Sequence, residues 1–162
     1  MGYEAERKRN PFTRSAAGAR ALNAIHRPWF TLRLPPAYGE LTTTGRKSGK
    51  ARRRYVRATR CGDKVYVVAI KGAGISGWAK NLRENPKVGL RIRDGTFEGT
   101  AREVSGAEES REGREAYCET VGPFEHVEYT MWRKGRPTPA KIRQLHGAWF
   151  DQGSPFVIEL DV

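Results

Sequence analysis

Short runs of alternating polar and apolar residues dominate the chain between residues 39 and 104. A period of two is typical of a strand with one buried face. Asp94-Gly95 joins two of these runs and predicts a type I′ hairpin turn. The segments predicted as strands are GELTTTG, RRYVRATR, KVYVVAI, KVGLRIR, TFEGTAREV and, at residues 156–162, FVIELDV. The chain therefore predicts about six strands, paired mainly as antiparallel hairpins.

Helical patterns interrupt and follow these strands. Residues 76–85 predict a short helix that begins at Ser76 and ends before Pro86. Ser105 and Glu108 form a capping-box pattern at the start of a longer helix. That helix is expected to end near residue 120, and further helices are predicted over residues 13–25, 124–134 and 139–150. Hairpin strands with inserted and appended helices favour an α+β fold built on a small antiparallel barrel.

The 162 residues predict a single domain in two parts. Residues 1–36 are expected to form a basic helix and an extended arm, because Pro28, Pro35 and Pro36 forbid a long regular element there. Residues 37–162 are expected to form the barrel.

The chain gives no sign of membrane insertion, secretion or metal binding. No stretch approaches the roughly 18 apolar residues that span a bilayer, and the charged N-terminus lacks the apolar region of a secretory signal. Cys61 and Cys118 stand far apart with no CxxC, which fits free thiols in a reducing cytoplasm. His26, His126 and His146 show no paired-ligand spacing, so no metal site is expected.

The net charge of +12 lies in one part of the chain. Residues 1–60 hold 15 basic and 3 acidic side chains, whereas residues 61–162 hold 15 of each, so the whole excess precedes residue 61. Such asymmetry indicates an anionic partner, which could be nucleic acid, an acidic membrane surface or a polyanionic small molecule.

Residues 46–60 carry the densest charge, with eight Lys or Arg and no acidic residue. The run opens with GRKSG directly after the Thr-rich strand LTTTG. A turn with convergent amides and adjacent cations is suited to phosphate or polycarboxylate, although GRKSG lacks the Walker A spacing. The alternative is a solvated hairpin tip. Strand alternation places Arg52 and Arg54 on one face, and Arg53 and Tyr55 on the other.

Two further segments carry candidate site residues. Lys71-Gly72 follows the strand KVYVVAI, and a lysine beside a glycine-rich break can line an anion pocket or be an ordinary turn residue. Trp78 and Asn81 share one face of the short helix that follows. A tryptophan in such a position more often anchors a core.

The aromatic residues Tyr117, Phe124, Tyr129 and Trp132 form the last candidate group. Phe124 and Trp132 are eight residues apart, so a helix would place them near one face. Such stripes more often pack into a core than line a pocket. No combination of nucleophile, base and acid is visible, so an enzyme of this sequence would rely on a cofactor.

The order of these segments resembles a known family. LTTTGRKSG, an arginine-bearing strand, VYVVAIKGAG and WAKNLRENPKVGLRI together are similar to the deazaflavin-dependent nitroreductases, the quinone-reductase-like branch of the flavin/deazaflavin oxidoreductases. The resemblance covers residues 41–92 well and extends weakly to FVIELDV. It implies that residues 37–162 form a split β-barrel that binds reduced coenzyme F-420, which carries a phosphate and an oligoglutamate tail.

The resemblance also implies roles for individual residues. The residues expected to hold the anionic tail are Arg46, Lys47, Ser48, Gly49, Arg52 and Arg54. The residues expected beside the deazaflavin rings are Ala69, Ile70, Lys71, Gly72, Trp78 and Asn81. The acceptor is expected against Phe124, His126, Tyr129 and Trp132, with Tyr129 or solvent as the proton source.

The implied reaction is hydride transfer from the reduced deazaflavin to a quinone, a nitro compound or an activated alkene. The chain also departs from the family pattern. Ile70 replaces a common serine, the proline that often follows Arg52 is missing, and the tyrosine-rich acceptor wall is reduced. Residues 134–154 are expected to add a helix before the last strand.

Three alternatives remain beside this interpretation. The same fold could bind FMN, although eight cations exceed what one phosphate needs. A non-enzymatic nucleic-acid-binding barrel would fit the net charge and Tyr55, but no aromatic platform is evident, so nucleic acid is not expected. Arg14, Arg20, Trp29 and Phe30 would suit a peripheral membrane contact by a cytoplasmic protein. The resemblance further implies a homodimer.

Overall fold

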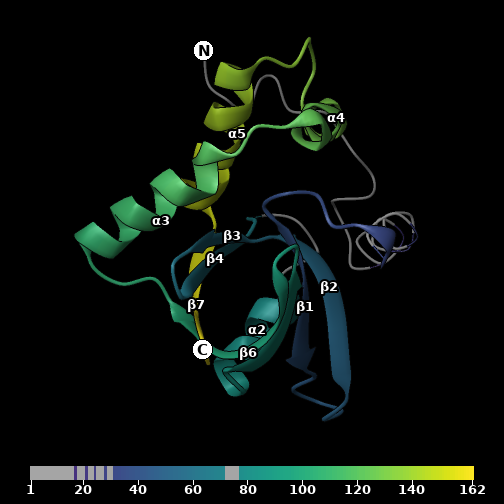
Figure 1. Ribbon diagram of the computed structural model, residues 1–162, viewed down its shortest axis with the longest axis vertical. Helices are drawn as coiled ribbons and strands as arrows, with labels where there is room; N and C mark the ends of the chain where they lie inside the picture. The colour runs from purple at the N-terminus through teal and green to yellow at the C-terminus, as the bar shows by residue number, and fades with distance from the viewer. Residues whose placement is uncertain (1–16, 18–20, 22–23, 25–27, 29–30, 72–76) are drawn as a thin grey trace.

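The computed structural model describes residues 31–71 and 77–162, together with residues 17, 21, 24 and 28 (Figure 1). Most of the expected N-terminal helix over residues 13–25 lies outside the described residues, as do the expected membrane-contacting residues Trp29 and Phe30. Gly72 and Ser76 lie outside them as well. Pro28, Thr31 and Leu32 are helical, where an extended arm was expected. Within the part that the structure describes, no helix is long and apolar enough to span a membrane.

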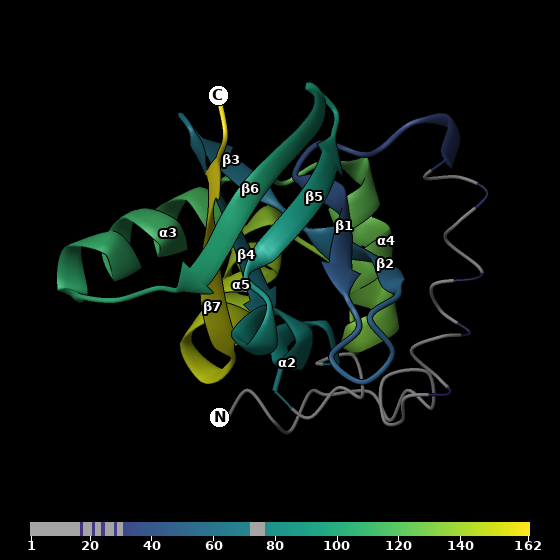
Figure 2. The same ribbon diagram turned by 90° about the horizontal axis from the view of Figure 1, so that it is seen from below.

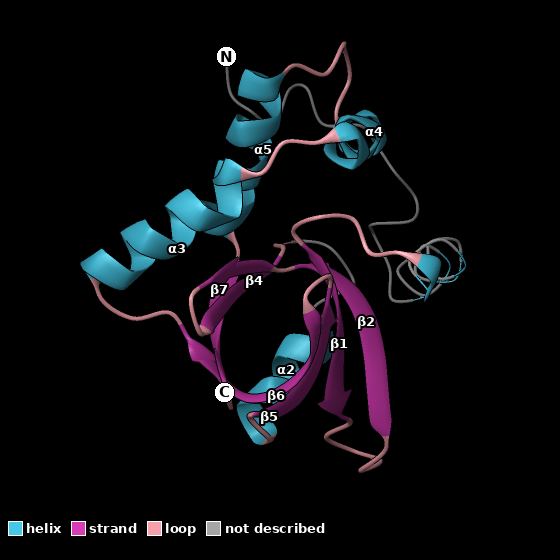
Figure 3. Ribbon diagram, in the orientation of Figure 1, coloured by secondary structure: helices cyan, strands magenta, loops and turns pink. Residues whose placement is uncertain are grey.

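Seven strands form one curled antiparallel sheet (Figure 3). The strands are β1 (Tyr38–Thr44), β2 (Ala51–Arg57), β3 (Thr59–Cys61), β4 (Lys64–Ala69), β5 (Lys87–Ile92), β6 (Gly95–Glu103) and β7 (Ser154–Leu160). Their order in the sheet is β2-β1-β5-β6-β7-β4-β3, and every pairing is antiparallel. The predicted α+β split barrel is confirmed.

The sheet has one strand more than the prediction. The segment RRYVRATR, predicted as one strand, is β2 and β3, separated by Ala58. The break occurs because the two halves have different neighbours: β2 pairs with β1, and β3 pairs with β4. The Ala58 N–H instead donates to the carbonyl of Ala37 at 2.9 Å.

The β5–β6 hairpin is confirmed, but the predicted turn type is wrong. Ile92 pairs with Gly95, so the turn residues are Arg93 and Asp94. A type I′ turn requires positive φ at both residues, and Ala37 alone among the described non-glycine residues has positive φ. Gly95, with φ of 147°, begins β6 instead.

Four helices lie within residues 77–162, and each coincides with a predicted one. They are α2 (Gly77–Glu84), α3 (Ala107–Glu119), α4 (Pro123–Trp132) and α5 (Pro139–Gln152). The predicted capping box of α3 is wrong, because Gly106 is the N-cap residue and no side chain caps it. The Ser105 N–H donates instead to Glu109 Oε2 at 3.1 Å.

The two sides of the sheet bury different cores. Inside the curl, strand residues such as Leu41, Val67 and Phe156 pack with Trp78 and Leu82 of α2. The helices α3, α4 and α5 lie outside the curl (Figure 1), with α5 between the other two (Figure 2). Their shared core consists of Val68, Tyr117, Tyr129, Trp132, Ile142, Leu145, Trp149 and Phe150. Neighbouring residues of β4 thus serve opposite cores, as strand alternation requires.

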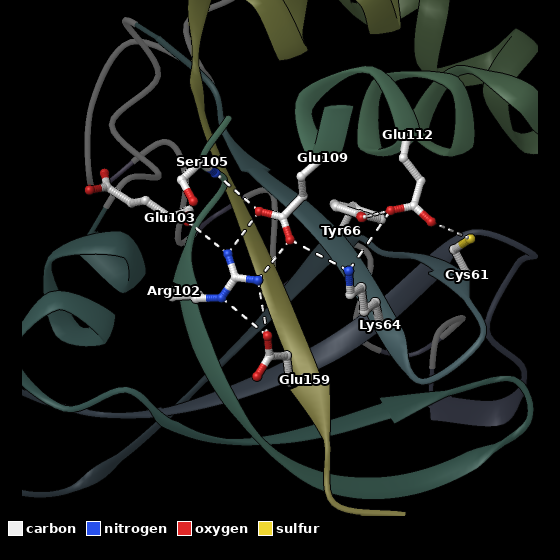
Figure 4. Close-up of polar contacts among 9 residues, drawn as sticks. All are labelled: Cys61, Lys64, Tyr66, Arg102, Glu103, Ser105, Glu109, Glu112 and Glu159. Carbon is white, nitrogen blue, oxygen red and sulfur yellow. Dashed lines mark hydrogen bonds and ion pairs between the residues drawn. The ribbon is translucent and has the colours of Figure 1, made fainter. Parts of the chain in front are cut away.

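A surface network attaches the first turn of α3 to the barrel (Figure 4). Arg102 of β6 donates to both carboxylate oxygens of Glu109 at 2.7 and 2.8 Å and to Glu159 of β7 at 3.0 Å. The hydrogen bonds from Arg102 lower the pKa of Glu109 to about 2. Glu112, one turn further along, accepts from Tyr66 Oη at 2.8 Å.

A second polar network lies buried beneath α4 and α5. Tyr38 of β1 donates from its hydroxyl to Glu128 of α4, and the other carboxylate oxygen of Glu128 lies 3.4 Å from His146 Nε2 of α5. His146 is fully buried, and its Nδ1 has no hydrogen-bond partner among the described residues. Burial lowers the pKa of His146 and raises that of Tyr38.

Candidate functional site

The loop of residues 45–50, called the GRKSG loop after its first five residues, is a tight link between β1 and β2. The Gly45 N–H donates to the Lys50 carbonyl at 2.8 Å, and the Gly49 N–H donates to the Gly45 carbonyl at 2.7 Å. Gly49 has φ of 66°, a left-handed conformation that favours glycine. The side chains of Arg46, Lys47 and Ser48 are exposed.

The backbone N–H groups of the loop are less available to an anion than the sequence predicted. The N–H groups of Gly45 and Gly49 are used within the loop, and the Lys50 N–H lies 3.3 Å from Ser48 Oγ. The Arg46 N–H donates to Asn81 Oδ1 at 3.2 Å. Since these four donors already have protein acceptors, an anion here would depend mainly on side chains.

Asn81 joins the loop to helix α2. It accepts from the Arg46 backbone through Oδ1 and donates from Nδ2 to Thr43 Oγ1 at 3.1 Å. Asn81 is 7% exposed and Thr43 is buried, so the hydrogen bond between them is sheltered from water, whereas the bond to the exposed Arg46 is only partly buried. The structure therefore brings together two sequence-predicted residues, Arg46 and Asn81, that are 35 positions apart.

The arginines of β2 divide between two faces, as strand alternation predicts. The register pairs Arg52 with Thr43 and Arg54 with Leu41, both of which are buried, whereas Arg53 pairs with Thr42. Arg52 lies next to the loop, with Nη2 3.5 Å from Ser48 Oγ. Arg52 and Arg54 thus lie on the same face of β2 as the buried side of β1, here called the inner face, near Ser48 and Asn81, and Arg53 lies on the opposite face.

The residues expected beside the deazaflavin rings are only partly grouped. Ala69 is buried at the end of β4, Ile70 is half-buried and Lys71 is exposed. Trp78 is 5% exposed and lies 5.8 Å from the Phe156 ring, in the core inside the curl. Trp78 is therefore part of the core inside the curl. From the sequence, this role was the alternative to a contact with the coenzyme.

The four expected acceptor residues lie on α4 but not in one wall. Phe124 packs edge-on against Tyr38 at 4.7 Å, in a small cluster with Leu34. Tyr129 and Trp132 belong to the core of the helices, where Tyr129 is only 2% exposed. The His126 ring nitrogen Nδ1 lies 2.8 Å from the Gly122 carbonyl within the helix. Phe124 and Trp132 belong to different side-chain clusters.

The basic run also contains a structural residue that sequence reasoning missed. Arg57 is buried and pairs with Glu125 of α4 at 3.1 Å, their side chains being 2% and 1% exposed. It also donates to the carbonyls of Tyr117 and Thr120 near the end of α3, at 2.9–3.0 Å. The one sequence signal for a buried Arg57 is that it follows Tyr55 and Val56, the apolar end of this strand.

Comparison with known proteins gives the family. A sequence model described as F420H(2)-dependent quinone reductase matches residues 33–134. The chain belongs to this family. The match extends beyond residues 41–92, where the motifs lie, and includes α3 and α4.

Solved structures of this fold are also similar. One, described as "Structure of F420-H2 Dependent Reductase (FDR-A)", is 25% identical over 76% of this chain and 94% of its own, with a TM-score of 0.50. Another, described as a domain-swapped dimer, is 24% identical over 87% of this chain and 98% of its own, with a TM-score of 0.51.

Family membership resolves the cofactor. The protein is an oxidoreductase that uses coenzyme F-420, as the motifs implied, and the FMN alternative is not supported. The alternative of a non-enzymatic nucleic-acid-binding barrel is likewise not supported. The residues around the loop fit such a coenzyme, because Arg46, Lys47 and Arg52 are exposed cations beside an exposed hydroxyl.

Proposed function

We propose that the protein binds reduced coenzyme F-420 between the GRKSG loop, the inner face of β2 and helix α2, and reduces an electron-poor small molecule. The acceptor classes are quinones, nitro compounds and activated alkenes. The observation that carries the proposal is the Asn81 bridge, which connects the loop to α2 in a chain of this family.

The anionic tail would be held mainly by side chains. Arg46, Lys47 and Ser48 project from the loop, and Arg52 approaches Ser48 from the inner face of β2. Arginine can bind phosphate or carboxylate oxygens with two parallel hydrogen bonds, and lysine adds a point charge. Gly49 gives the loop its turn, and Arg54 extends the same face.

The deazaflavin rings would lie at the end of β4, beside Ala69, Ile70, Lys71 and Gly72. When bound, the coenzyme supplies the hydride. The protein orients the reactants and provides positive charge. Because Tyr129 is buried among the helices, water is the proton source that this structure favours. The resemblance also supports a homodimer as the assembly to test.

The test is a binding titration of the purified protein at two salt concentrations. The ligands are reduced and oxidised coenzyme F-420, FMN and single-stranded DNA. We expect micromolar affinity for the deazaflavin that weakens at high salt and falls further in Arg46→Ala and Lys47→Ala. Arg111→Ala, which removes an exposed positive charge of α3, is the matched control and should bind normally.

Absence of deazaflavin binding, together with tight and salt-sensitive DNA binding, would contradict the proposal. If binding is found, oxidation of the reduced coenzyme by menadione, a nitroimidazole and an activated enone would rank the acceptor classes. Size-exclusion chromatography with light scattering would measure the assembly.

A further inference from the structure

A small crevice lies where the end of β4 meets the ends of α4 and α5. It has a volume of about 20 Å³ and is lined by Ile70, Lys71, Arg133, Ala148, Trp149 and Gln152. Among the lining residues, Lys71 and Gln152 are exposed, whereas Trp149 and Arg133 are buried. The lining includes two cations and no carboxylate.

The fold builds this crevice through a close approach of backbone segments. Gly153 follows α5, and a Cβ atom there would lie 2.6 Å from the carbonyl oxygens of both Ala69 and Trp149. Only glycine permits this contact, which holds Trp149 and Gln152 against the end of β4. On the other side, Arg133 is the C-cap residue of α4, and its N–H donates to the Tyr129 carbonyl at 2.8 Å.

The size and charge of the crevice fit a single oxygen atom of a ligand. A cavity needs roughly 10–15 Å³ to hold one water molecule, so about 20 Å³ admits one oxygen and excludes a ring. Arg133 is 7% exposed, and a sheltered guanidinium attracts a developing negative charge more strongly than a solvated one does. Trp149 of the lining forms a T-shaped pair with Trp132, with centroids 5.1 Å apart.

We infer that this crevice receives the carbonyl or nitro oxygen of the electron acceptor, with Arg133 as the residue that contacts it. The inference rests on the proposed function, since Ile70 and Lys71 of the crevice are also expected beside the deazaflavin rings. When a quinone accepts a hydride, it gains two electrons and one hydrogen, and negative charge appears on its oxygen. Arg133 stabilises that charge, and water then supplies the proton.

The test compares two variants that each lower the positive charge of the crevice, by different means. Arg133→Gln removes the cation, and Gln152→Glu adds an anion at an exposed position where misfolding is not expected. In both, kcat/KM for menadione should fall at least about tenfold, with most of the loss in kcat. The dissociation constant of coenzyme F-420 should stay within about twofold. Arg136→Gln, an exposed arginine three residues along the chain, is the control for net charge.

A second measurement does not depend on turnover. With the oxidised coenzyme bound, 2-hydroxy-1,4-naphthoquinone, which is an anion at neutral pH, should quench tryptophan fluorescence as it binds beside Trp149. Its affinity should fall about tenfold in both variants, and Arg133→Lys should restore part of the loss.

The outcomes separate this inference from the proposed function. If the unmodified protein neither binds the coenzyme nor reduces a quinone, the proposed function fails. If it does both, and Gln152→Glu and a folded Arg133→Gln behave as the unmodified protein does, only the crevice assignment is wrong. Equal losses in coenzyme affinity and turnover would also overturn it, because Arg133 would then act through the cofactor site.

Discussion

The two ends of the basic run, residues 46–60, lie in opposite environments. At the start, Arg46 and Lys47 project into solvent from a loop that uses its own amides for internal hydrogen bonds. Arg57, eleven positions after Arg46, is buried with Glu125 under α3 and α4. The same residue type therefore supplies a binding surface at one end of β2 and a structural ion pair at the other.

The difference shows that charge density in a sequence overstates the charge available to a ligand. Arg57 is neutralised by Glu125, and Arg60 lies over the Phe97 ring and 3.7 Å from Asp94. Arg53 faces away from the loop site. Within the described run, the cations that converge on the candidate site are those of the loop and of the inner face of β2.

The largest effect is expected from breaking the buried pair. Glu125→Gln leaves the Arg57 guanidinium buried without a carboxylate, so the free energy of unfolding should fall by about 3–5 kcal/mol. Urea denaturation measures this change. The matched control is Glu115→Gln, which removes the exposed partner of Arg111 and should cost less than about 1 kcal/mol. Equal losses in the two variants would show that the buried pair has no special role.

An intermediate effect is expected at Asn81. Asn81→Ala removes the acceptor of the Arg46 N–H and the donor to the buried Thr43 hydroxyl, which should cost about 1–3 kcal/mol of stability. Coenzyme affinity should fall with it, because the loop loses its attachment to α2. Asn81→Asp keeps the acceptor for the Arg46 N–H but adds a carboxylate beside the anion site, so its coenzyme affinity should fall at least as far as that of Asn81→Ala. Titration and urea denaturation of both variants provide the measurement.

A smaller effect, on coenzyme affinity alone, is expected from substitutions on the two faces of β2. Arg52→Gln should weaken coenzyme binding about tenfold, which corresponds to about 1.4 kcal/mol, with little change in stability. Arg53→Gln removes the same charge from the opposite face and should change the dissociation constant less than about twofold. If both variants lose affinity equally, binding follows overall charge and the division between the faces is irrelevant.

The smallest effect is expected in mild acid. Burial lowers the pKa of His146 in the folded protein, so the unfolded chain binds more protons once the pH falls below the ordinary value of about 6.5. The stability linked to His146 is thus present above that pH and declines as the pH falls toward the folded pKa. Facing groups are Glu128, Arg57, Glu125 and the Tyr117 ring. Between pH 7 and pH 5, the free energy of unfolding of His146→Gln should therefore fall less than that of the unmodified protein.

Local patterns predicted most of the elements. The alternating runs gave the strands, and Pro86 and Pro123 mark helix boundaries that the structure also has. The misses have both local and distant causes. At the start of α3, Gly106 is the N-cap residue, and the Glu109 carboxylate accepts from the Ser105 N–H and from Arg102. The second basic strand divides at Ala58, because its halves pair with different neighbours.

The candidate site was predictable in its motifs and less so in its contacts. The GRKSG loop and Asn81 were expected in one site, but the hydrogen bond between them depends on how α2 fits inside the curl. Burial of Arg57 depends on Glu125, which lies 68 residues away. Phe124 and Tyr129 belong to different clusters because α4 packs against two separate groups of side chains. A helical pattern in the sequence does not show which group each residue joins.

The place of β7 in the sheet has a consequence for biosynthesis. Residues 154–160 lie between β6 and β4, so before they join, the strands β2-β1-β5-β6 and the pair β4-β3 share no hydrogen-bonded neighbour. Pairing across such sequence distances is slow, and unpaired strand edges promote aggregation. The complete sheet can therefore form only after translation has passed residue 160, and until then β6 and β4 lack the neighbour that joins them.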